Sequence, residues 1–280
     1  MPAAGPFHVN LGWLQFAGRI WRDLSPGAPL YFYLHGFAGS GEDCDFLRTE
    51  NGDFDRNWVS TDWIGHGASS APAVGEVYGL NWQLEGLRRA ALAFPGHPRV
   101  LVGYSMGARL ALYAALRYPD LFERLILISG TAGIESANIR ADRRRRDAGW
   151  AQLILSKGLE AFANSWEQQP VIAAQDCMPA ATLNFWQQRR RHQSPIGLAH
   201  AIQSLSPGLL PVLWDRLAEI HQPTLILSGQ RDATYVDYAN RLEKTLPNAL
   251  HLSLPNCGHC LHMERPLEFL INTQVLDQRR

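Results

Sequence analysis

Three residues of the types that together support nucleophilic or acid–base catalysis follow one another in the order Ser, Asp, His. Ser105 is the centre of "GYSMG", a G-x-S-x-G pattern, Asp232 lies in "SGQRDA" and His259 lies in "NCGHC". A serine hydroxyl is activated when a histidine takes its proton and a carboxylate orients that histidine. We therefore predict that Ser105, Asp232 and His259 form a catalytic triad.

Catalysis by an activated serine also needs donors for the oxyanion that develops in the reaction. The N–H of Met106 directly follows the predicted nucleophile, and the N–H of Phe37 lies in "LHGF", a glycine-containing turn after a strand-like run. We expect these two backbone groups to form an oxyanion hole. We expect structural roles for His35 in this turn and for His66 in "DWIGHG".

The stretch "CGHC" also permits two other kinds of chemistry. Its two cysteines could form a redox pair, and Cys257, His259, Cys260 and His262 could bind zinc. A redox C-x-x-C normally opens a helix after an early strand, whereas this one follows the last strand-like run. Either use would also occupy His259. We therefore favour two incidental thiols beside a catalytic histidine, and expect neither a metal nor a cofactor.

The elements that must position these residues are strands buried on both faces. Short apolar runs of this kind recur between turns and helical stretches. They lie at Leu30–Leu34, Trp58–Thr61, Arg99–Gly103, Arg124–Ser129, Pro223–Gly229 and Ala249–Pro255. A helical pattern follows Ser105 and stops at Pro119. This alternation predicts an α/β fold with a doubly wound, mostly parallel sheet.

Residues 131–211 have a different pattern. They are rich in Arg, Gln, Ala and Trp, and their helical periodicity is broken by prolines at positions 170, 179, 195 and 207. We predict that this segment is a helical lid inserted into a core made of residues 1–130 and 212–280.

The predicted lid is positively charged although the whole chain is neutral. It has nine Lys and Arg against six Asp and Glu, and every cation but Lys157 is an arginine. Arginine grips carboxylates with a planar fork, which lysine cannot do. This composition predicts a site for a small polycarboxylate substrate.

The run "IRADRRRRDAGW" divides by helical phase. At about 100° per residue one face carries Arg140, Arg143, Arg144, Asp147 and Trp150. Arg145 points the opposite way and Arg146 lies at the flank. Because Asp147 is four residues past Arg143, it can hold that guanidinium in place. We therefore expect Arg143 to bind substrate and Arg145 to be solvated.

These motifs together resemble a known family. "HGF", "DWIGHG", "GYSMG", "GQRD" and "GH" occur in the order found in α/β-hydrolases, over nearly the full chain. "GYSMGAR", "RADRRRRDAGW", "ANSWEQQPV" and "RRRHQSPIGLA" more narrowly resemble the 2-succinyl-6-hydroxy-2,4-cyclohexadiene-1-carboxylate synthases of menaquinone and phylloquinone biosynthesis. The resemblance implies an α/β-hydrolase fold with a lid and a cofactor-free lyase. Such a lyase removes the proton α to the succinyl ketone and expels pyruvate from 2-succinyl-5-enolpyruvyl-6-hydroxy-3-cyclohexene-1-carboxylate.

The resemblance also implies which residues contact the substrate. The pocket would be lined by Tyr104, Arg109, Arg143, Trp166 and Arg190. Three adjacent arginines, 189 to 191, leave the last assignment open by one position. Ala108 stands where the family commonly has glycine, so its methyl group could crowd the pocket floor or shift the helix bearing Arg109. A serine hydrolase of esters or carbon–carbon bonds would use the same triad and stays the alternative.

Bulk properties limit the other function classes. A chain of 280 residues with 46% hydrophobic and 19% charged residues is typical of a globular protein. Zero net charge argues against a nucleic-acid binder, and an intact triad argues against a non-catalytic ligand sensor. The start "MPAAGPFHVNLGW" lacks a signal-peptide pattern, and no apolar run is long enough to span a membrane. Four cysteines in a chain of this length do not indicate a fold held together by disulfides. We expect a cytoplasmic enzyme without membrane partners; its oligomeric state is left open.

Overall fold

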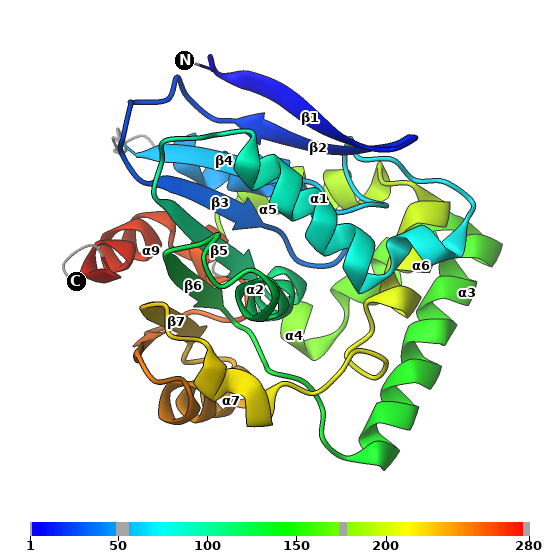
Figure 1. Ribbon diagram of the computed structural model, residues 1–280. Helices are drawn as coiled ribbons and strands as arrows, with labels where there is room; N and C mark the ends of the chain where they lie inside the picture. The colour runs from blue at the N-terminus through cyan, green and yellow to red at the C-terminus, as the bar shows by residue number, and fades with distance from the viewer. Residues whose placement is uncertain (1, 49–55, 174–177, 277–280) are drawn as a thin grey trace.

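A computed structural model describes residues 2–48, 56–173 and 178–276 of the chain, and its centre is one eight-stranded sheet (Figure 1). The spatial order is β1-β2-β4-β3-β5-β6-β7-β8. The strands are β1 (Gly5–Leu11), β2 (Leu14–Ile20), β3 (Leu30–Leu34), β4 (Asn57–Thr61), β5 (Arg99–Tyr104), β6 (Arg124–Ile128), β7 (Thr224–Gly229) and β8 (Ala249–Leu254). From β4 to β8 all neighbours are parallel, while β1 and β2 pair antiparallel at one edge. The predicted mostly parallel sheet is confirmed.

All six predicted strands are present, with ends that differ by at most two residues. The β1–β2 hairpin was not predicted. In β1 exposed residues alternate with partly buried ones, and the turn passes through Gly12 at φ 68°. An edge hairpin covered on one side has this weaker pattern, because only every second side chain packs.

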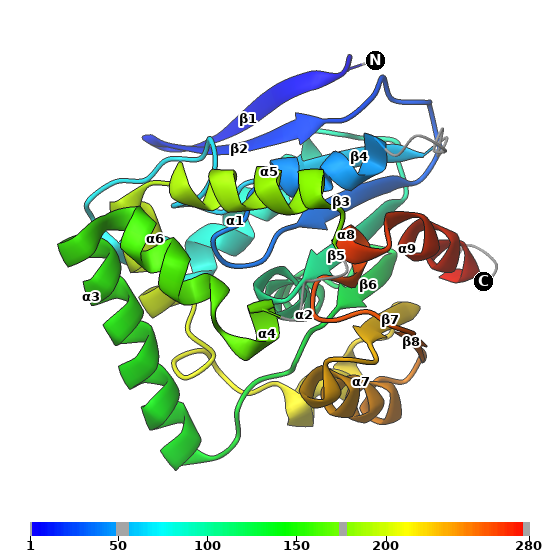
Figure 2. The ribbon, with the colours of Figure 1, turned by 180° about the vertical axis from the view of Figure 1, so that it is seen from behind.

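Helices cover both faces of the sheet (Figures 1 and 2). One face carries α1 (Leu80–Leu92), α2 (Met106–Arg117) and α7 (Ala233–Thr245); the other carries α5 (Ala180–Arg191), α8 (Leu261–Glu264) and α9 (Pro266–Thr273). Short 3-10 helices occur at Gly41–Arg48, Gly75–Tyr78, Trp214–Glu219 and Gln274–Leu276. None of the helices that the structure describes combines the length and apolarity needed to cross a membrane.

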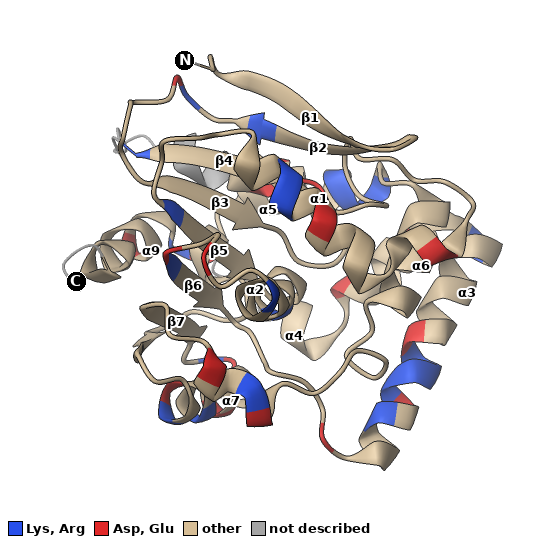
Figure 3. Ribbon diagram, viewed as in Figure 1, with Lys and Arg blue, Asp and Glu red and all other residues tan. Residues whose placement is uncertain are grey.

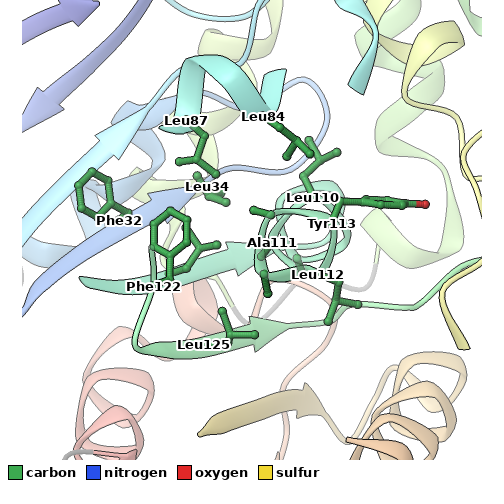
Figure 4. Packing of buried hydrophobic residues seen from close by; sticks show 14 of the residues in the cluster. Phe32, Leu34, Leu84, Leu87, Leu110, Ala111, Leu112, Tyr113, Phe122 and Leu125 are labelled. Atoms are coloured by element: carbon green, nitrogen blue, oxygen red, sulfur yellow. The ribbon is translucent and has the colours of Figure 1, made fainter. Parts of the chain in front are cut away.

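Each central strand divides its side chains between two cores. In β3, Phe32 and Leu34 pack toward α1 and α2, whereas Tyr31 and Tyr33 pack on the opposite face. Figure 4 shows the first core, where Leu110 of α2 and its neighbours meet residues of α1 and of the strands. Burial on both faces explains why these strands are continuously apolar in sequence.

Among the described residues, four α-helices come between β6 and β7 in the sequence; α5 lies on one face of the sheet and the other three lie beside it (Figures 1 and 2). They are α3 (Ala137–Glu167), α4 (Pro170–Ala173), α5 and α6 (Pro195–Ser204), called here the α3–α6 segment. Three of the four predicted proline breaks lie at helix starts: Pro170 and Pro195 begin α4 and α6, and Pro179 directly precedes α5. Proline is well placed there because a first-turn residue needs no N–H donor.

The longest of these helices, α3, turns back on itself. Gly158 has φ 81° and ψ 177°, a conformation that interrupts the helix. The rings of Trp150 and Trp166 are 5.2 Å apart, whereas sixteen residues of straight helix would separate them by about 24 Å. The helix therefore consists of two arms joined at Gly158. Figure 2 shows the reversal above α4.

Candidate active site

The turn around Ser105 is strained and depends on two glycines. Ser105 joins β5 to α2 with φ 51° and ψ −105°, and its N–H donates to the Ile128 carbonyl at 2.9 Å. A Cβ at Gly107 would overlap the Leu34 carbonyl, and one at Gly103 would overlap the backbone of Gly107. Only glycine fits at both positions, so the G-x-S-x-G spacing follows from the close approach of three chain segments.

The structure brings the three predicted catalytic residues into one hydrogen-bonded chain. Nε2 of His259 lies 2.9 Å from the Ser105 Oγ, and its Nδ1 lies 2.7 Å from Asp232 Oδ2. The His259 side chain is only 4% exposed. Asp232 directly follows the loop after β7 and His259 the loop after β8. These loops meet where Gly229 leaves room for the carbonyl of Gly258.

A buried carboxylate fixes the loop that bears His259. Glu264 accepts the N–H of Gly258 at 2.7 Å and that of Cys260 at 3.1 Å, the residues on either side of the histidine. The hydroxyl of Ser129 donates to the His259 carbonyl at 2.8 Å. Burial raises the pKa of Glu264, while the two N–H bonds lower it. The sequence analysis did not identify this residue, because its only signal is an acid five positions after His259.

The predicted oxyanion donors lie beside Ser105. Phe37 and Met106 line the same cavity as the serine, and no residue in the described ranges accepts a hydrogen bond from either N–H. A Cβ at Gly36 would lie 2.8 Å from the ring of Tyr104. The loop can approach Ser105 this closely only because position 36 is glycine.

Two buried histidines hold this loop in place. Nε2 of His35 accepts the N–H of Trp63 at 3.2 Å, and Nε2 of His66 accepts the N–H of Ala38 at 3.3 Å. Burial lowers the pKa of His35 to about 3 and that of His66 well below its usual value. Both imidazoles therefore stay neutral at physiological pH, as suits a structural role.

The cavity at Ser105 has a volume of about 200 Å³. Its aromatic walls are formed by Phe37, Tyr104, Trp150, Trp166, Trp186, Tyr235 and Tyr238, and its charged residues are Arg109, Arg143, Arg146 and Asp147. Tyr235 packs on the candidate base, with ring centroids 4.4 Å apart. Tyr235, Tyr238 and Trp186 were not predicted. Tyr235 lies one helical turn after Asp232, which is the only sequence signal for it.

Two predicted arginines reach this cavity. Arg109 donates from Nη1 to the Leu205 carbonyl at 3.1 Å. Burial, and next the positive charge of Arg143, lower its pKa to about 10. Arg143 donates from Nε to both oxygens of Asp147, at 2.9 and 3.0 Å, which confirms the predicted pairing. Asp147 is buried, so the pair is anchored within the protein.

The helix face predicted to carry Arg140, Arg143 and Arg144 does not meet the cavity as a whole. Arg140 and Arg144 do not face the cavity: they donate to the carbonyls of Leu209 and Gly208, at 3.2 and 2.7 Å. The loop after α6 contacts this side of the helix, and helical periodicity alone does not predict that contact. Arg145 points away and pairs with Asp142, as its predicted phase requires. Figure 3 shows the basic residues gathered on this arm of α3.

Arg146, predicted to lie at the flank, lines the cavity instead. The cavity face of α3 thus carries Arg143, Arg146, Asp147 and Trp150. This is the i, i+3, i+4, i+7 spacing of a single helix face.

Arg190 departs from its predicted position in the pocket wall. Its side chain is 1% exposed, donates to Glu167 at 2.9 Å, and stacks on Trp186 with 4.4 Å between guanidinium carbon and ring centroid. Trp186 lines the cavity and Arg190 lies behind it. Of its neighbours, Arg189 donates to Ser40 and Arg191 pairs with Glu167, and neither lines the cavity.

Tyr104 and Trp166 line the cavity as expected from the resemblance. The hydroxyl of Tyr104 is engaged with Cys260 Sγ at 2.6 Å, and burial raises the pKa of this tyrosine well above its usual value. Ala108 does not reach the cavity floor. Its methyl packs at Gly130, where a Cβ would lie 2.8 Å away.

The cysteines beside His259 are poorly suited to thiolate chemistry. Cys257 and Cys260 are fully buried and form no disulfide, and burial raises the pKa of the Cys260 thiol. Redox exchange and zinc binding both require a thiolate. Within the described ranges, no group of three or more His, Cys, Asp and Glu is arranged to hold a metal ion.

The chain is similar in sequence and in structure to known proteins. Residues 30–266 match the family described as alpha/beta hydrolase fold. A putative 2-succinyl-6-hydroxy-2,4-cyclohexadiene-1-carboxylate synthase of Bacillus subtilis is 34% identical over 236 residues, which cover 84% of this chain and 85% of the relative. The synthase of the same name from Escherichia fergusonii is 31% identical over 249 residues, covering 86% and 90%. The solved structure of MenH from S. aureus superposes with a TM-score of 0.85 at 27% identity, covering 99% and 98%.

Proposed function

The chain belongs to the α/β-hydrolase family and, within it, to the 2-succinyl-6-hydroxy-2,4-cyclohexadiene-1-carboxylate synthases, and from this premise we propose that it is the corresponding lyase. Its substrate is then 2-succinyl-5-enolpyruvyl-6-hydroxy-3-cyclohexene-1-carboxylate and its second product is pyruvate. One observation carries the proposal: the Ser105–His259–Asp232 chain opens into a cavity lined by arginines.

The first step removes the proton from C2 of the ring, next to the succinyl ketone. With its proton on Nδ1, His259 donates to Asp232 and accepts from Ser105 through Nε2. As His259 takes the serine proton, the Ser105 oxygen takes the C2 proton. The electron pair of the C–H bond moves to the ketone oxygen. The N–H groups of Phe37 and Met106 supply donors for this enolate.

The second step expels the leaving group. The enolate re-forms the ketone while C2=C3 is made, the C3=C4 double bond moves to C4=C5, and the C5–O bond breaks. Enolpyruvate leaves and becomes pyruvate when its terminal carbon takes a proton. The proton lost from C2 equals the proton gained by pyruvate, so the reaction needs no oxidant or other co-reactant.

Arg109 and Arg143 account for recognition of the substrate. The substrate carries a carboxylate on the ring, on the succinyl arm and on the enolpyruvyl group. Asp147 holds Arg143 through Nε, and no residue that the structure describes accepts from its Nη groups, so these can make a bidentate contact with a carboxylate. The α3–α6 segment supplies the Arg143 contact, and α2 of the core supplies the Arg109 contact. We propose that residues 131–211 act as the lid over a core of residues 1–130 and 212–280.

Pyruvate release tests this function directly. The purified protein is given the enolpyruvyl substrate in an assay coupled to a dehydrogenase, with a nitrophenyl ester in a parallel reaction. We expect fast pyruvate release, slow ester cleavage, and a loss of roughly a thousandfold or more in pyruvate release for Ser105→Ala. Fast ester cleavage without pyruvate release would instead identify a serine hydrolase that uses the same triad.

A further inference from the structure

Three guanidinium groups line the cavity, and they differ in what they already bind. Arg109 is engaged with the Leu205 carbonyl, and Arg143 is engaged with Asp147. Arg146 has no hydrogen-bond or ion-pair partner among the residues that the structure describes. From this contrast we infer that Arg146 is a further substrate-binding residue, which takes a carboxylate at the mouth of the cavity.

The neighbouring arginines of α3 show that this is not a general property of the run. Arg140 and Arg144 dock the helix on the carbonyls of residues 209 and 208, and Arg145 pairs with Asp142 on the outer face. Arg146 alone among the five described arginines of this run both lines the cavity and lacks a partner.

The local charge balance also favours Arg146. The carboxylate of Asp147 offsets the charge of Arg143, and Arg109 is partly buried with its Nη1 on the Leu205 carbonyl. Arg146 is exposed to solvent, and no carboxylate among the described residues pairs with it. An incoming anion therefore meets Arg146 as the uncompensated charge at the entrance.

The position of Arg190 strengthens the inference. This arginine is paired with Glu167 behind Trp186, which removes it from the cavity wall. The substrate in the proposed function has three carboxylates, and Arg109, Arg143 and Arg146 are the three guanidiniums that line the described cavity. The identity of the substrate rests on the proposed function, whereas the anion site at Arg146 rests on geometry alone.

Two adjacent substitutions give a matched test. Arg146→Ala and Arg145→Ala remove the same charge from neighbouring positions of one helix, but only residue 146 faces the cavity. For Arg146→Ala we expect the KM for the enolpyruvyl substrate to rise 10- to 100-fold with kcat within threefold, because a contact present throughout the reaction contributes uniform binding. For Arg145→Ala we expect both constants within twofold. Arg146→Lys should lie between, since it keeps the charge but not the fork.

Thermal unfolding separates binding from folding. We expect equal Tm values for the two alanine variants, because Arg146 is exposed without a hydrogen-bond or ion-pair partner among the described residues, and the exposed Arg145–Asp142 pair adds little stability. Equal KM values for the two variants would overturn the inference. A lower Tm with a proportional fall in kcat for Arg146→Ala would also overturn it, since that pattern marks a structural role.

A second readout does not depend on the lyase reaction. Labelling of Ser105 by a fluorophosphonate is measured with increasing propane-1,2,3-tricarboxylate, or with its neutral trimethyl ester. We expect the tricarboxylate to protect the wild type and Arg145→Ala, and to require at least tenfold higher concentration with Arg146→Ala. This result in a protein that releases no pyruvate would refute the proposed function but support the anion site. Absence of protection in the wild type, or equal protection in all three proteins, would refute the anion site.

Discussion

At the residue scale, Glu264 acts on the candidate base through the backbone on either side of it, by accepting the N–H groups of Gly258 and Cys260. Ser105, His259 and Asp232 each stand in a short motif after a strand, so the sequence places them at one sheet edge. Glu264 has no such motif. Its importance depends on a short helix returning its carboxylate to the two N–H groups beside His259, which only the folded chain shows.

Replacing Glu264 tests whether it positions the base. In Glu264→Gln the amide NH2 must face one of the two backbone donors that the carboxylate now accepts. We expect kcat for pyruvate release to fall about 10- to 100-fold while KM changes less than threefold, because a displaced His259 affects the proton transfer and not carboxylate binding. Glu268→Gln, an exposed position on α9, is the control and should leave kcat unchanged. Similar kcat values for the two variants would contradict the positioning role.

A double-mutant cycle tests the Arg143–Asp147 pair. Arg143→Ala leaves the Asp147 carboxylate buried without its partner, so we expect the free energy of unfolding to fall by roughly 1–3 kcal/mol. Arg143→Ala/Asp147→Ala removes the isolated charge and should recover part of that loss, while kcat/KM stays low in both proteins. Urea unfolding and pyruvate-release kinetics measure the two effects. A double variant less stable than the sum of the single ones would contradict the pairing.

At the scale of elements, the sequence predicts the effect of the prolines in the α3–α6 segment on helix boundaries better than it predicts the effect of Gly158. Prolines 170, 179 and 195 are predicted as breaks in the helical pattern, and the structure has a helix start at each of them. Gly158 stands in a periodic helical stretch, and a glycine there is compatible with either a continuous helix or a reversal. The structure has the reversal, and aromatic contacts join the two arms of α3 through Trp150, Phe162 and Trp166. Such contacts are invisible to periodicity.

Two glycines of α3 provide a matched pair of substitutions. Gly158→Ala forces a Cβ into φ 81°, ψ 177°, which glycine alone adopts readily, and we expect a loss of about 1–3 kcal/mol with a raised KM. Gly149→Ala, at an exposed helical position with open space around it, should gain about 0.5–1 kcal/mol and leave KM unchanged. Unfolding and steady-state kinetics provide the comparison. A neutral or stabilising Gly158→Ala would show that the arms do not require this backbone conformation.

At the scale of the whole molecule, the sequence predicts the strands of the sheet better than it predicts how the α3–α6 segment packs around the cavity. Strands such as β3 are set by local apolar runs, which the sequence shows directly. Which side of α3 faces the cavity depends instead on carbonyl groups more than sixty residues away, at Gly208 and Leu209. Arg190 was misplaced for the same reason, because its partner Glu167 belongs to a different helix.

Buried neutral histidines make the fold sensitive to acid. Burial, and next the charge of His259, lower the pKa of His262 to about 3, and its Nε2 lies 2.9 Å from the Tyr33 hydroxyl. Between pH 6.5 and 3 the unfolded state binds a proton at this histidine that the native state does not, so its contribution to stability is lost as pH falls through this range. Asp43 acts in the opposite direction: burial raises its pKa to about 7, which favours the native state as pH falls toward 3.8.

The histidine contribution is therefore measured as a difference between variants. We expect the free energy of unfolding of His262→Gln to depend less steeply on pH than that of the wild type, by up to about 1.4 kcal/mol per pH unit between pH 4 and 6. Urea unfolding across this range gives both slopes, and His8→Gln, at an exposed position of β1, is the control. Parallel curves for wild type and His262→Gln would contradict the burial of a neutral imidazole.

The α3–α6 segment leaves and rejoins the core at almost the same point. The N–H of Leu213 donates to the Ala132 carbonyl at 2.8 Å, and Nε1 of Trp214 donates to the Gly133 carbonyl at 3.0 Å. The strands on either side, β6 and β7, are direct neighbours in the sheet. These two hydrogen bonds join the two ends of the segment at one point beside the sheet. We expect that grafting this segment between relatives changes the cavity contacts of Arg143 and Trp166 together, whereas the contact of Arg109 stays with the core.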